Sequence, residues 1–367
     1  MANDGRGRER RGGVGMTREE EPRILLGHGD GGRLTHDLIR SVFLPHFDNP
    51  ANPVLRPLPD AAVLAPPAGW RLAFTTDSFV VSPAFFPGGN IGTLAVTGTV
   101  NDLAVSGARP AYLSVAFILE EGYPLRQLEA VVESMALAAR DAGVQIVTGD
   151  TKVVEHGAAD GIYINTAGIG WVPEDLHWGL DAVRPGDVVL LSGSPGAHGM
   201  AVLLSRGDLG FQSPIRSDCA SVFPLVQALQ GVPGIRFMRD PTRGGVATVL
   251  NEVAQGSGLD VWVEEAALPE DPAVSAAARL LGVDPLYLAC EGRVVAICAP
   301  DAAAAVLDAW RAVPGGLGRD AAAIGHVSAS RRLPLGPRPE PAVYLRTALG
   351  GTRLLDVKSG GELPRIC

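Results

Sequence analysis

The 367-residue sequence lacks the features of membrane-spanning and nucleic-acid-binding proteins. It contains no apolar run near the 18 residues that a transmembrane helix needs. Asp and Glu outnumber Lys and Arg, so the formal net charge is -9 and no basic stripe is available to displace counterions from nucleic acid. We therefore expect a soluble protein with no membrane span and no nucleic-acid partner.

Cysteine is also scarce. Cys219, Cys290, Cys298 and Cys367 form neither a C-x-x-C pair nor a zinc-binding spacing. This pattern fits a reducing cytoplasm, in which Cys367 would remain a free thiol. Residues 1–22 lack the apolar stretch of a secretory signal, and we interpret them as a disordered extension in which Met16 is an alternative start.

What the chain does contain is enough apolar sequence for two domains. Its length and its hydrophobic content of 46% suffice for two packed cores, and the 46 glycines and 29 prolines are scattered as in a protein with many tight turns. Near residues 173–185 the chain passes from one domain to the next. We place the first domain at 23–175, the second at 176–352 and a flexible tail at 353–367.

Two glycine-rich stretches can bring backbone amides close to an anion. The first, Gly27-His28-Gly29-Asp30-Gly31-Gly32, follows the apolar start of the first domain, and a plain turn explains it equally well. The second runs from Arg239 to Val246 between a strand and a helix, and includes Asp240, Arg243, Gly244 and Gly245. A helix that starts on glycines offers N–H groups to a phosphate, so we interpret this stretch as a phosphate or metal corner.

Polar residues interrupt two apolar elements of the first domain. Asp77 lies within the strand expected over residues 71–82, where a carboxylate is costly unless it is paired or binds a metal. Thr97, Asn101 and Asp102 lie on adjoining faces of the helix expected over 91–107. A bound nucleotide with Mg²⁺ would supply their partners. A strand-end turn at Asp77 and an internal hydrogen-bond network in the helix are the alternatives.

Three further residues are candidates for the chemistry. The strand 144–147 leads into Thr148-Gly149-Asp150-Thr151-Lys152, and ligand groups of α/β proteins lie just beyond the carboxyl ends of strands. Lys152 is the candidate cation, although most lysines simply lie on the surface. Glu291 has apolar neighbours that can raise its pKa toward that of a general base, or it caps a turn.

The last residue of the sequence is a cysteine that follows a linker. Residues 358–362 are Lys-Ser-Gly-Gly-Glu, which is typical of a flexible segment, and Pro364 stiffens the tip. Cys367 would then be carried on an arm into a site elsewhere in the chain. The alternative is a frayed end that happens to stop at cysteine.

Six motifs together resemble the HypE family, the carbamoyl dehydratases of [NiFe]-hydrogenase maturation. They are Thr76-Asp77-Ser78-Phe79-Val80-Val81, Phe86-Pro87-Gly88-Gly89-Asn90-Ile91-Gly92, Gly98-Thr99-Val100-Asn101-Asp102-Leu103-Ala104, Gly149-Asp150-Thr151-Lys152-Val153-Val154, Asp240-Pro241-Thr242-Arg243-Gly244-Gly245 and Pro364-Arg365-Ile366-Cys367. The likeness runs from about Ile24 to Cys367 and leaves only the amino-terminal extension outside it.

The resemblance implies an α/β (α+β) fold like that of aminoimidazole ribonucleotide synthetase and selenophosphate synthetase. In that superfamily the amino-terminal domain binds ATP and forms a β-barrel across a homodimer, and an α/β domain follows. The resemblance further implies three groups of site residues. Asp60, Asp77, Asp102 and Asp240 are the metal and phosphate region; Asn101, Gly149, Asp150 and Thr151, with the loop at Gly29 to Gly32, line the nucleotide pocket; Lys152 and Glu291 act on the group carried by Cys367.

The activity implied is ATP-dependent dehydration of a carbamoyl group on the sulfur of Cys367 to thiocyanate, which supplies cyanide to the hydrogenase iron. The expected cofactors are ATP and Mg²⁺, and the expected partners are the carbamoyltransferase HypF and the HypC-HypD complex. Two alternatives remain open on the residues alone. One is a superfamily kinase or synthetase acting on a free metabolite, and the other is a maturation scaffold without catalysis.

Overall fold

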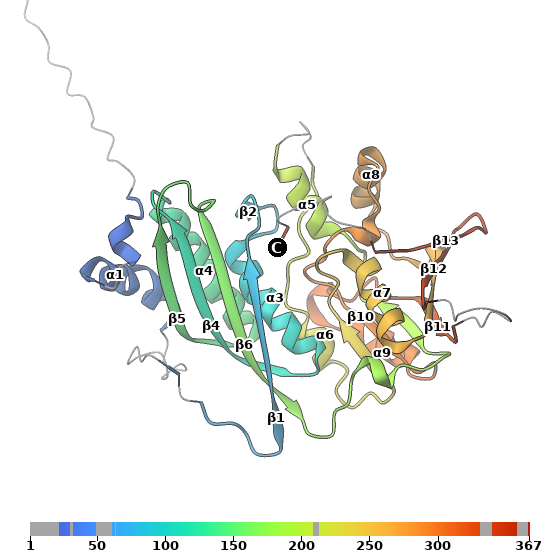
Figure 1. The fold of residues 1–367 in the computed structure, drawn as a ribbon. Coiled ribbons are helices and arrows are strands. Elements are labelled where there is room, and N and C mark those ends of the chain that lie inside the picture. The colour runs from blue at the N-terminus through green and yellow to red at the C-terminus, as the bar shows by residue number, and fades with distance from the viewer. Residues whose placement is uncertain are drawn as a thin grey trace, which may run out of the picture.

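Two β-sheets organise the molecule, one in each half of the chain (Figure 1). The computed structural model describes residues 22–29, 32–48, 61–62, 64–207, 213–330, 340–357 and 366–367. Within these ranges no helix is both long enough and apolar enough to span a membrane. The last residue lies between the two halves, so the tip of the chain returns to the place where they meet.

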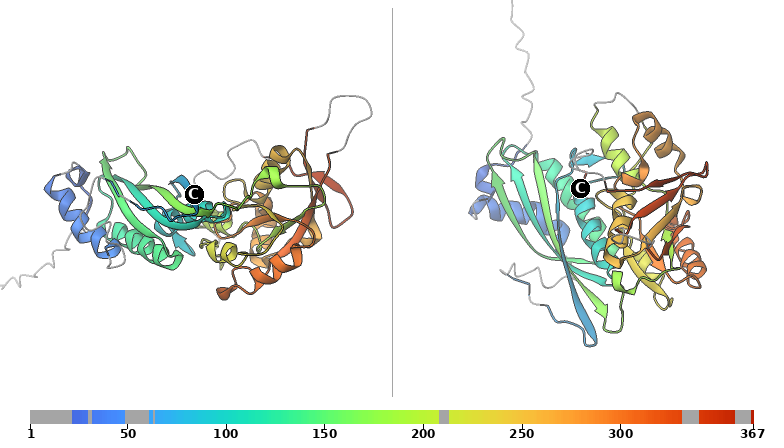
Figure 2. Two further views of the ribbon diagram at one scale, coloured as in Figure 1. Left: turned by 90° about the horizontal axis from the view of Figure 1, so that it is seen from below. Right: turned by 45° about the vertical axis from the view of Figure 1, so that its right-hand side comes forward.

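The first half is a four-stranded sheet covered on one face by two helices (Figure 2). Its strand order is β1-β6-β4-β5, with bounds Trp70–Phe79 (β1), Ile162–Pro173 (β6), Arg109–Glu120 (β4) and Gln145–Val154 (β5). The covering helices are α3 (Ile91–Val105) and α4 (Leu125–Ala142). The apolar residues of α4 recur every three or four positions, so one stripe of that helix packs on the sheet.

The other face of this sheet is open and partly apolar. Leu72, Phe74 and Ile118 have exposed fractions of 61%, 67% and 42%. Their strand neighbours point to the helix-covered core because successive side chains of a strand alternate between faces. An apolar sheet face of this kind is typical of an interface with another surface.

Short elements flank the sheet. Next to the edge strand β5 lie η1 (Leu26–Gly29), α1 (Arg33–Leu38), a π-helical turn η2 (Ile39–Phe43) and α2 (Leu44–Phe47). Two-residue strands β2 (Phe85–Phe86) and β3 (Gly89–Asn90) form a hairpin before α3. The Asn90 side chain caps α3 by accepting hydrogen bonds from two backbone N–H groups of its first turn.

The second half is a seven-stranded mixed sheet of order β13-β12-β9-β11-β7-β10-β8. The strands are β7 (Val188–Leu191), β8 (Ile235–Arg239), β9 (Asp260–Glu264), β10 (Val295–Cys298), β11 (Ala322–Ser328), β12 (Val343–Arg346) and β13 (Thr352–Leu354). The helices are η3 (Leu180–Ala182), α5 (Ala197–Ser205), α6 (Phe223–Gln227), α7 (Gly245–Ser257), η4 (Glu265–Ala267), α8 (Pro272–Leu281), η5 (Pro285–Tyr287), α9 (Ala303–Arg311) and η6 (Pro314–Gly316). Separate apolar cores lie on its two faces.

Asn101 joins the two halves. This fully buried residue of α3 donates from Nδ2 to the carbonyl oxygens of Ala220 and Glu291, at 3.1 and 3.2 Å. Its Oδ1 accepts from the backbone N–H of Val222 at 2.8 Å. Both amide donors are therefore used, so Asn101 belongs to an internal network, the alternative that the sequence left open. Its role in the structure is to fix α3 to the segments around residues 220 and 291.

The strand prediction is wrong in one respect that concerns the site. Residues 148–152 were expected to follow a short strand, but they lie inside β5, paired in parallel with β4. Gly149 fits there because a Cβ atom would come within 2.6 Å of the carbonyl oxygen of Val115 on β4. The pairing with β4 outweighs the low strand propensity of glycine and aspartate.

Candidate functional site

Four carboxylates lie close enough to influence one another where the halves meet. Asp77 comes from β1 and Asp102 from α3, while Asp240 follows β8 and Glu291 precedes β10. Asp77, Asp102 and Asp240 each raise the pKa of Glu291, which shows that the four negative charges act on one another across the junction. Their elements come from both halves, so the cluster exists only when the halves are packed together.

Two of these carboxyl groups have unsatisfied oxygens. Oδ2 of Asp240 and Oε1 of Glu291 are buried without a hydrogen-bond partner. Burial, followed by the negative charge of Asp102, raises the pKa of Asp240 to about 7. Burial also raises the pKa of Glu291 well above its usual range, and the neighbouring Asp240 and Asp218 add to the effect. Buried unpaired acceptors are costly, so these atoms are suited to meet a cation or a proton from a bound molecule.

Thr75 and Arg243 offset part of this charge. The hydroxyl of Thr75 donates to Oδ2 of Asp102 at 2.9 Å. Burial raises the pKa of both Asp77 and Asp102, and the positive charge of Arg243 acts in the opposite direction on each. Arg243 is itself exposed, which leaves its guanidinium free to meet an anion from solvent.

Gly244 and Gly245 bring α7 up to this cluster. Both have positive φ, 75° and 62°, which is the left-handed region that glycine adopts without strain. A Cβ on Gly245 would lie 2.5 Å from the carbonyl oxygen of Leu286, so glycine is also required by space. The amino end of α7 begins beside Asp240 and Arg243, as the sequence predicts for a phosphate corner.

The tip of the chain docks at the same place. The Ile366 side chain is buried in the core of the first half, 6% exposed, and the backbone N–H of Val80 donates to an oxygen of the terminal carboxylate of Cys367 at 3.1 Å. Burial and the nearby Glu291 raise the pKa of the Cys367 thiol to about 12, and Arg243 and Asp77 also act on it. The predicted sulfur thus lies within the electrostatic reach of three predicted site residues.

The sequence did not reveal His198 as part of this site. His198 is the second residue of α5 and is fully buried. Its Nε2 lies 2.8 Å from the carbonyl oxygen of Ile366, and its Nδ1 lies 2.8 Å from the hydroxyl of Ser217. A histidine in an otherwise apolar helix was the available signal, but such a residue is unremarkable without the tail contact.

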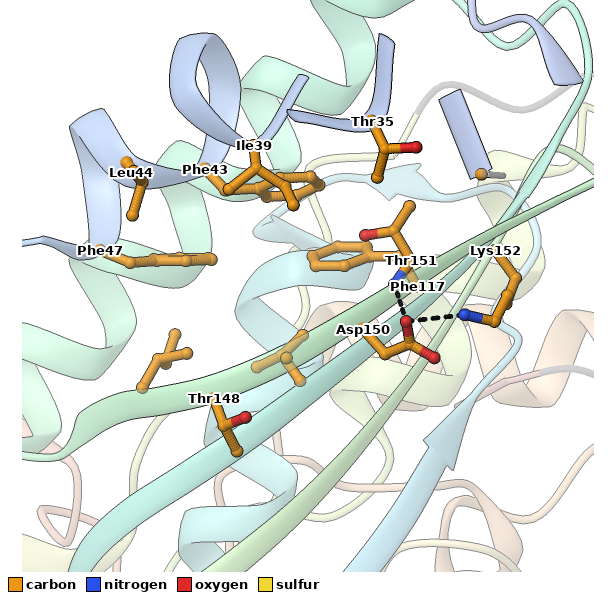
Figure 3. A pocket seen from close by; sticks show the side chains of 14 residues that line it. Thr35, Ile39, Phe43, Leu44, Phe47, Phe117, Thr148, Asp150, Thr151 and Lys152 are labelled. Carbon is orange, nitrogen blue, oxygen red and sulfur yellow. Dashed lines mark hydrogen bonds and ion pairs between the residues drawn. The ribbon is translucent and has the colours of Figure 1, made fainter. Parts of the chain in front are cut away.

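A second group of predicted residues surrounds a cavity at the edge of β5 (Figure 3). The cavity has a volume of about 190 Å³ and lies between β5, β4 and the helical turns of residues 35–47. One wall is apolar, with Phe43, Phe47 and Phe117, and the ring centroids of Phe43 and Phe117 are 5.0 Å apart. The polar wall has Gly29, Thr148, Gly149, Asp150, Thr151 and Lys152.

Within this polar wall Asp150 is bonded to its neighbours through one carboxylate oxygen. Its Oδ1 accepts from Nζ of Lys152 at 2.8 Å and from the backbone N–H of Thr151 at 2.9 Å (Figure 3). These contacts lower the pKa of Asp150, with the Lys152 hydrogen bond as the main cause. Gly29 lies against β5, where a Cβ would meet the backbone nitrogen of Val153 at 2.5 Å.

Lys152 and Asp77, one from each group, lie on opposite faces of the sheet within one chain. Lys152 is in register with Ile118, which is on the open face, whereas Asp77 packs against Gly98 of α3 on the covered face. Strands β1 and β5 are the two edges of the sheet, about 14 Å apart at ordinary strand spacing. Lys152 and Glu291 are therefore not brought together in a single subunit.

The carboxylate cluster has the donor chemistry for Mg²⁺. Hard cations take carboxylate oxygens, and the unpartnered oxygens of Asp240 and Glu291 are of that kind. Among the described residues, no three His, Cys, Asp or Glu side chains already converge on a common point that would bind a metal ion. Asp60 and Gly31, which the sequence assigns to the metal and nucleotide groups, lie outside the described residues, while Gly32 precedes α1 as its cap.

Family models and relatives cover most of the chain. The AIR synthase related protein N-terminal domain matches residues 59–172, and the corresponding C-terminal domain matches 184–335. The carbamoyl dehydratase HypE of Cupriavidus necator is 52% identical over 346 residues, which span 94% of this chain and 95% of that protein. HypE of Escherichia coli strain K12 is 48% identical, with 94% and 99% covered.

Solved structures agree with this assignment. A crystal structure of the hydrogenase maturation protein HypE in complex with ATP superposes with a TM-score of 0.87 at 49% identity, and covers 94% of this chain and 99% of that one. A crystal structure of a HypE-HypF complex superposes with a TM-score of 0.73 at 44% identity, with 88% and 99% covered. The two-domain α/β fold is thereby confirmed, and the chain belongs to the HypE family of carbamoyl dehydratases.

Proposed function

We propose that this enzyme uses ATP to dehydrate a carbamoyl group carried on its own Cys367. The observation that supports this most strongly is the docked tail, which brings the thiol into the field of Glu291, Arg243 and Asp77. The tail is held by the Ile366 side chain, by the Ile366 carbonyl oxygen and by the terminal carboxylate of Cys367, and none of these contacts uses the sulfur. The same docking can therefore accept the sulfur as a thiol, a carbamoyl thioester or a thiocyanate.

The proposed reaction removes the elements of water from the amide. The carbonyl oxygen of S-C(=O)-NH2 attacks the γ-phosphoryl group of ATP, which releases ADP and converts a poor leaving group into phosphate. Two protons then leave nitrogen as the C–O bond breaks, and S-C≡N and phosphate remain. Glu291 would accept a proton, and its raised pKa, which supports this role, makes its carboxylate a stronger base than an ordinary glutamate.

Arg243 and the amino end of α7 would bind the phosphate groups. The backbone N–H groups of a helix start and an exposed guanidinium both stabilise phosphoryl oxygens. Mg²⁺, when bound to Asp77, Asp102 and Asp240, supplies additional neutralisation of phosphate charge. Asp60 belongs to the same proposed group through the family resemblance.

We assign the base of the nucleotide to the cavity beside β5. Its volume is below the roughly 300 Å³ at which pockets hold a whole drug-sized ligand, so it suits a part such as a planar ring. The rings of Phe43 and Phe117 offer flat apolar surfaces, and Thr148, Thr151 and Lys152 supply polar groups at the rim. Gly29 lines this cavity, and the family resemblance assigns Gly31 and Gly32 to the same nucleotide group.

A homodimer would unite the two groups of residues. Lys152 and the exposed Leu72, Phe74 and Ile118 share the open face of the sheet. Packing two such faces together buries the apolar patch and carries Lys152 to the partner subunit, where it would reach that subunit's carboxylate cluster past the edge strand β1. In this arrangement each active site takes Lys152 from one subunit, and Glu291 with Cys367 from the other.

The proposed partners follow from the substrate. Cys367 must receive its carbamoyl group from a transferase, and a HypE relative has been crystallised with HypF. The product cyanide would pass to the HypC-HypD complex that carries the hydrogenase iron. All four cysteines are free thiols in the structure, which is consistent with a cytoplasmic enzyme.

Replacing Cys367 with alanine tests the proposal against a kinase or a scaffold. In wild-type protein incubated with HypF, carbamoyl phosphate and ATP, intact mass should rise by one carbamoyl group and then fall by one water. The Cys367→Ala protein should show neither change while it still binds ATP, because the nucleotide residues are intact. Delivery of cyanide to the acceptor complex by Cys367→Ala would contradict the proposal.

Mixed dimers test the sharing of Lys152 between subunits. Lys152→Ala and Glu291→Gln homodimers should both fail to dehydrate the carbamoylated protein. If Lys152 acts across the interface, random co-assembly of the two should restore roughly a quarter of the sites, since each mixed dimer contains one intact site. The measurement is the fraction of carbamoylated chains that lose water.

The matched control combines Glu291→Gln with Cys367→Ala. In each proposed site Glu291 and Cys367 come from the same subunit, so mixed dimers of these two variants contain no intact site. This pair should therefore give no recovery above that of the homodimers. If Lys152 and Glu291 act within one subunit, the first pair will also show no recovery, and the shared site is then ruled out.

Glu291→Gln should make the enzyme more stable as it inactivates it. Burial raises the pKa of Glu291 in the folded enzyme. The free energy of unfolding therefore falls as the pH rises from the unfolded-state pKa of this carboxyl group toward its folded-state pKa, because the unfolded chain gives up the proton first. Glutamine removes that loss. Thermal unfolding without nucleotide should show a higher midpoint for Glu291→Gln at pH 8, with a difference that shrinks toward pH 4.

The surface pair Glu264 and Arg346, 3.0 Å apart, supplies the control. Glu264→Gln should change the midpoint little, because an exposed ion pair contributes less than about 1 kcal/mol. A Glu291→Gln protein that is less stable than wild type at pH 8 would show that the carboxylate is compensated in the folded enzyme.

A further inference from the structure

We propose that His198 is a positioning residue that holds the tail by its backbone and so sets Cys367 in the active site. The inference rests on the proposed function for its catalytic consequence, but not for the docking itself. Its basis is the 2.8 Å contact between Nε2 of His198 and the carbonyl oxygen of Ile366, one residue before the reactive cysteine.

The hydrogen-bond pattern fixes the tautomer of His198. A carbonyl oxygen can only accept, so Nε2 carries the proton and donates it. Nδ1 of the neutral ring is then an acceptor for the hydroxyl of Ser217, whose oxygen also accepts from the backbone N–H of Cys219 at 3.0 Å. Burial lowers the pKa of His198, which favours this neutral ring. The ring edge also packs on Phe86, with centroids 5.2 Å apart.

The segment that orients His198 also orients the proposed base. Ser217 holds the imidazole, and the next residue, Asp218, accepts from the backbone N–H of Glu291 through Oδ1 at 3.1 Å. Two residues after Asp218, the backbone N–H of Ala220 donates to the carbonyl oxygen of Glu291 at 3.2 Å. Space between these segments is tight, because a Cβ on Gly292 would lie 1.9 Å from the carbonyl oxygen of Asp218.

One short segment therefore fixes the positions of both the tip of the tail and the proposed base. Residues 217–220 set the position of the Ile366 carbonyl through His198 and the position of Glu291 directly. A shift of either would change the separation between the group on Cys367 and the carboxylate, and catalysis is sensitive to such misplacement. His198 acts through the tail backbone and has no role in the bond-making steps.

Three variants test this assignment. His198→Leu removes the donor, His198→Gln keeps an N–H group at about the position of Nε2, and Ser205→Ala is a control on the same helix whose hydroxyl bonds only to Val202 within that helix. The first measurement is the rate at which iodoacetamide alkylates Cys367 in apo protein, monitored by the mass of the peptide that contains this residue. The second is the single-turnover rate of water loss from carbamoylated protein, with the ATP concentration dependence recorded.

His198→Leu should raise the alkylation rate of Cys367 by roughly five- to tenfold, as expected for the loss of one hydrogen bond. It should lower the maximal dehydration rate by at least as much without changing the ATP dependence. His198→Gln should recover most of both, and Ser205→Ala should match wild type. Thermal unfolding of each variant verifies that it folds.

An unchanged alkylation rate in folded His198→Leu protein would overturn the positioning role of His198. A His198→Gln protein as impaired as His198→Leu would overturn it too. The alkylation measurement needs neither ATP nor a carbamoyl group. If His198→Leu raises the alkylation rate while neither the variants nor the wild-type protein dehydrates, His198 holds the tail and the proposed function fails.

Discussion

The structure depends on holding like charges together where water is largely excluded. Asp240 and Glu291 are nearly or fully buried, and Asp77 and Asp102 act on them from the other half of the chain. This arrangement is unfavourable in isolation, because buried carboxylates raise one another's pKa. The packing of two apolar cores and the three hydrogen bonds of Asn101 keep the elements in place against that repulsion. Strain of this kind is common at functional sites, where a bound cation or substrate relieves it.

The tail is held with an energy suited to exchange. Burial of Ile366 contributes about 1.5–3 kcal/mol, and each of the two backbone hydrogen bonds contributes about 0.5–1.5 kcal/mol. Ordering the backbone of two residues costs about 1–2 kcal/mol each, and the closed loop costs more. These opposing contributions nearly cancel, so the tip can dock and leave. A reversible tip suits the proposed function, in which the thiol meets a transferase outside the site and ATP within it.

Sequence reasoning found the charged residues and missed their supports. Asp77, Asp102 and Glu291 were recognisable because carboxylates in apolar segments require an explanation. Asn101 was interpreted as a nucleotide ligand, with an internal network as the alternative, and its contacts with residues 220–222 and 291 show that network. His198 could not be identified, because its function depends on a residue 168 positions away. The separation of Lys152 from Glu291 could not be predicted either, because the motif does not say which face of the sheet its side chains occupy.

The central claim is that the chain carries its own substrate into a site where ATP activates the amide oxygen. The direct measurement is the fate of that oxygen. Protein carbamoylated with an oxygen-18 carbonyl, freed of transferase and given ATP should release inorganic phosphate containing one oxygen-18 atom for each water lost from the protein. Phosphate without the label, while the protein mass still falls by one water, would contradict the account.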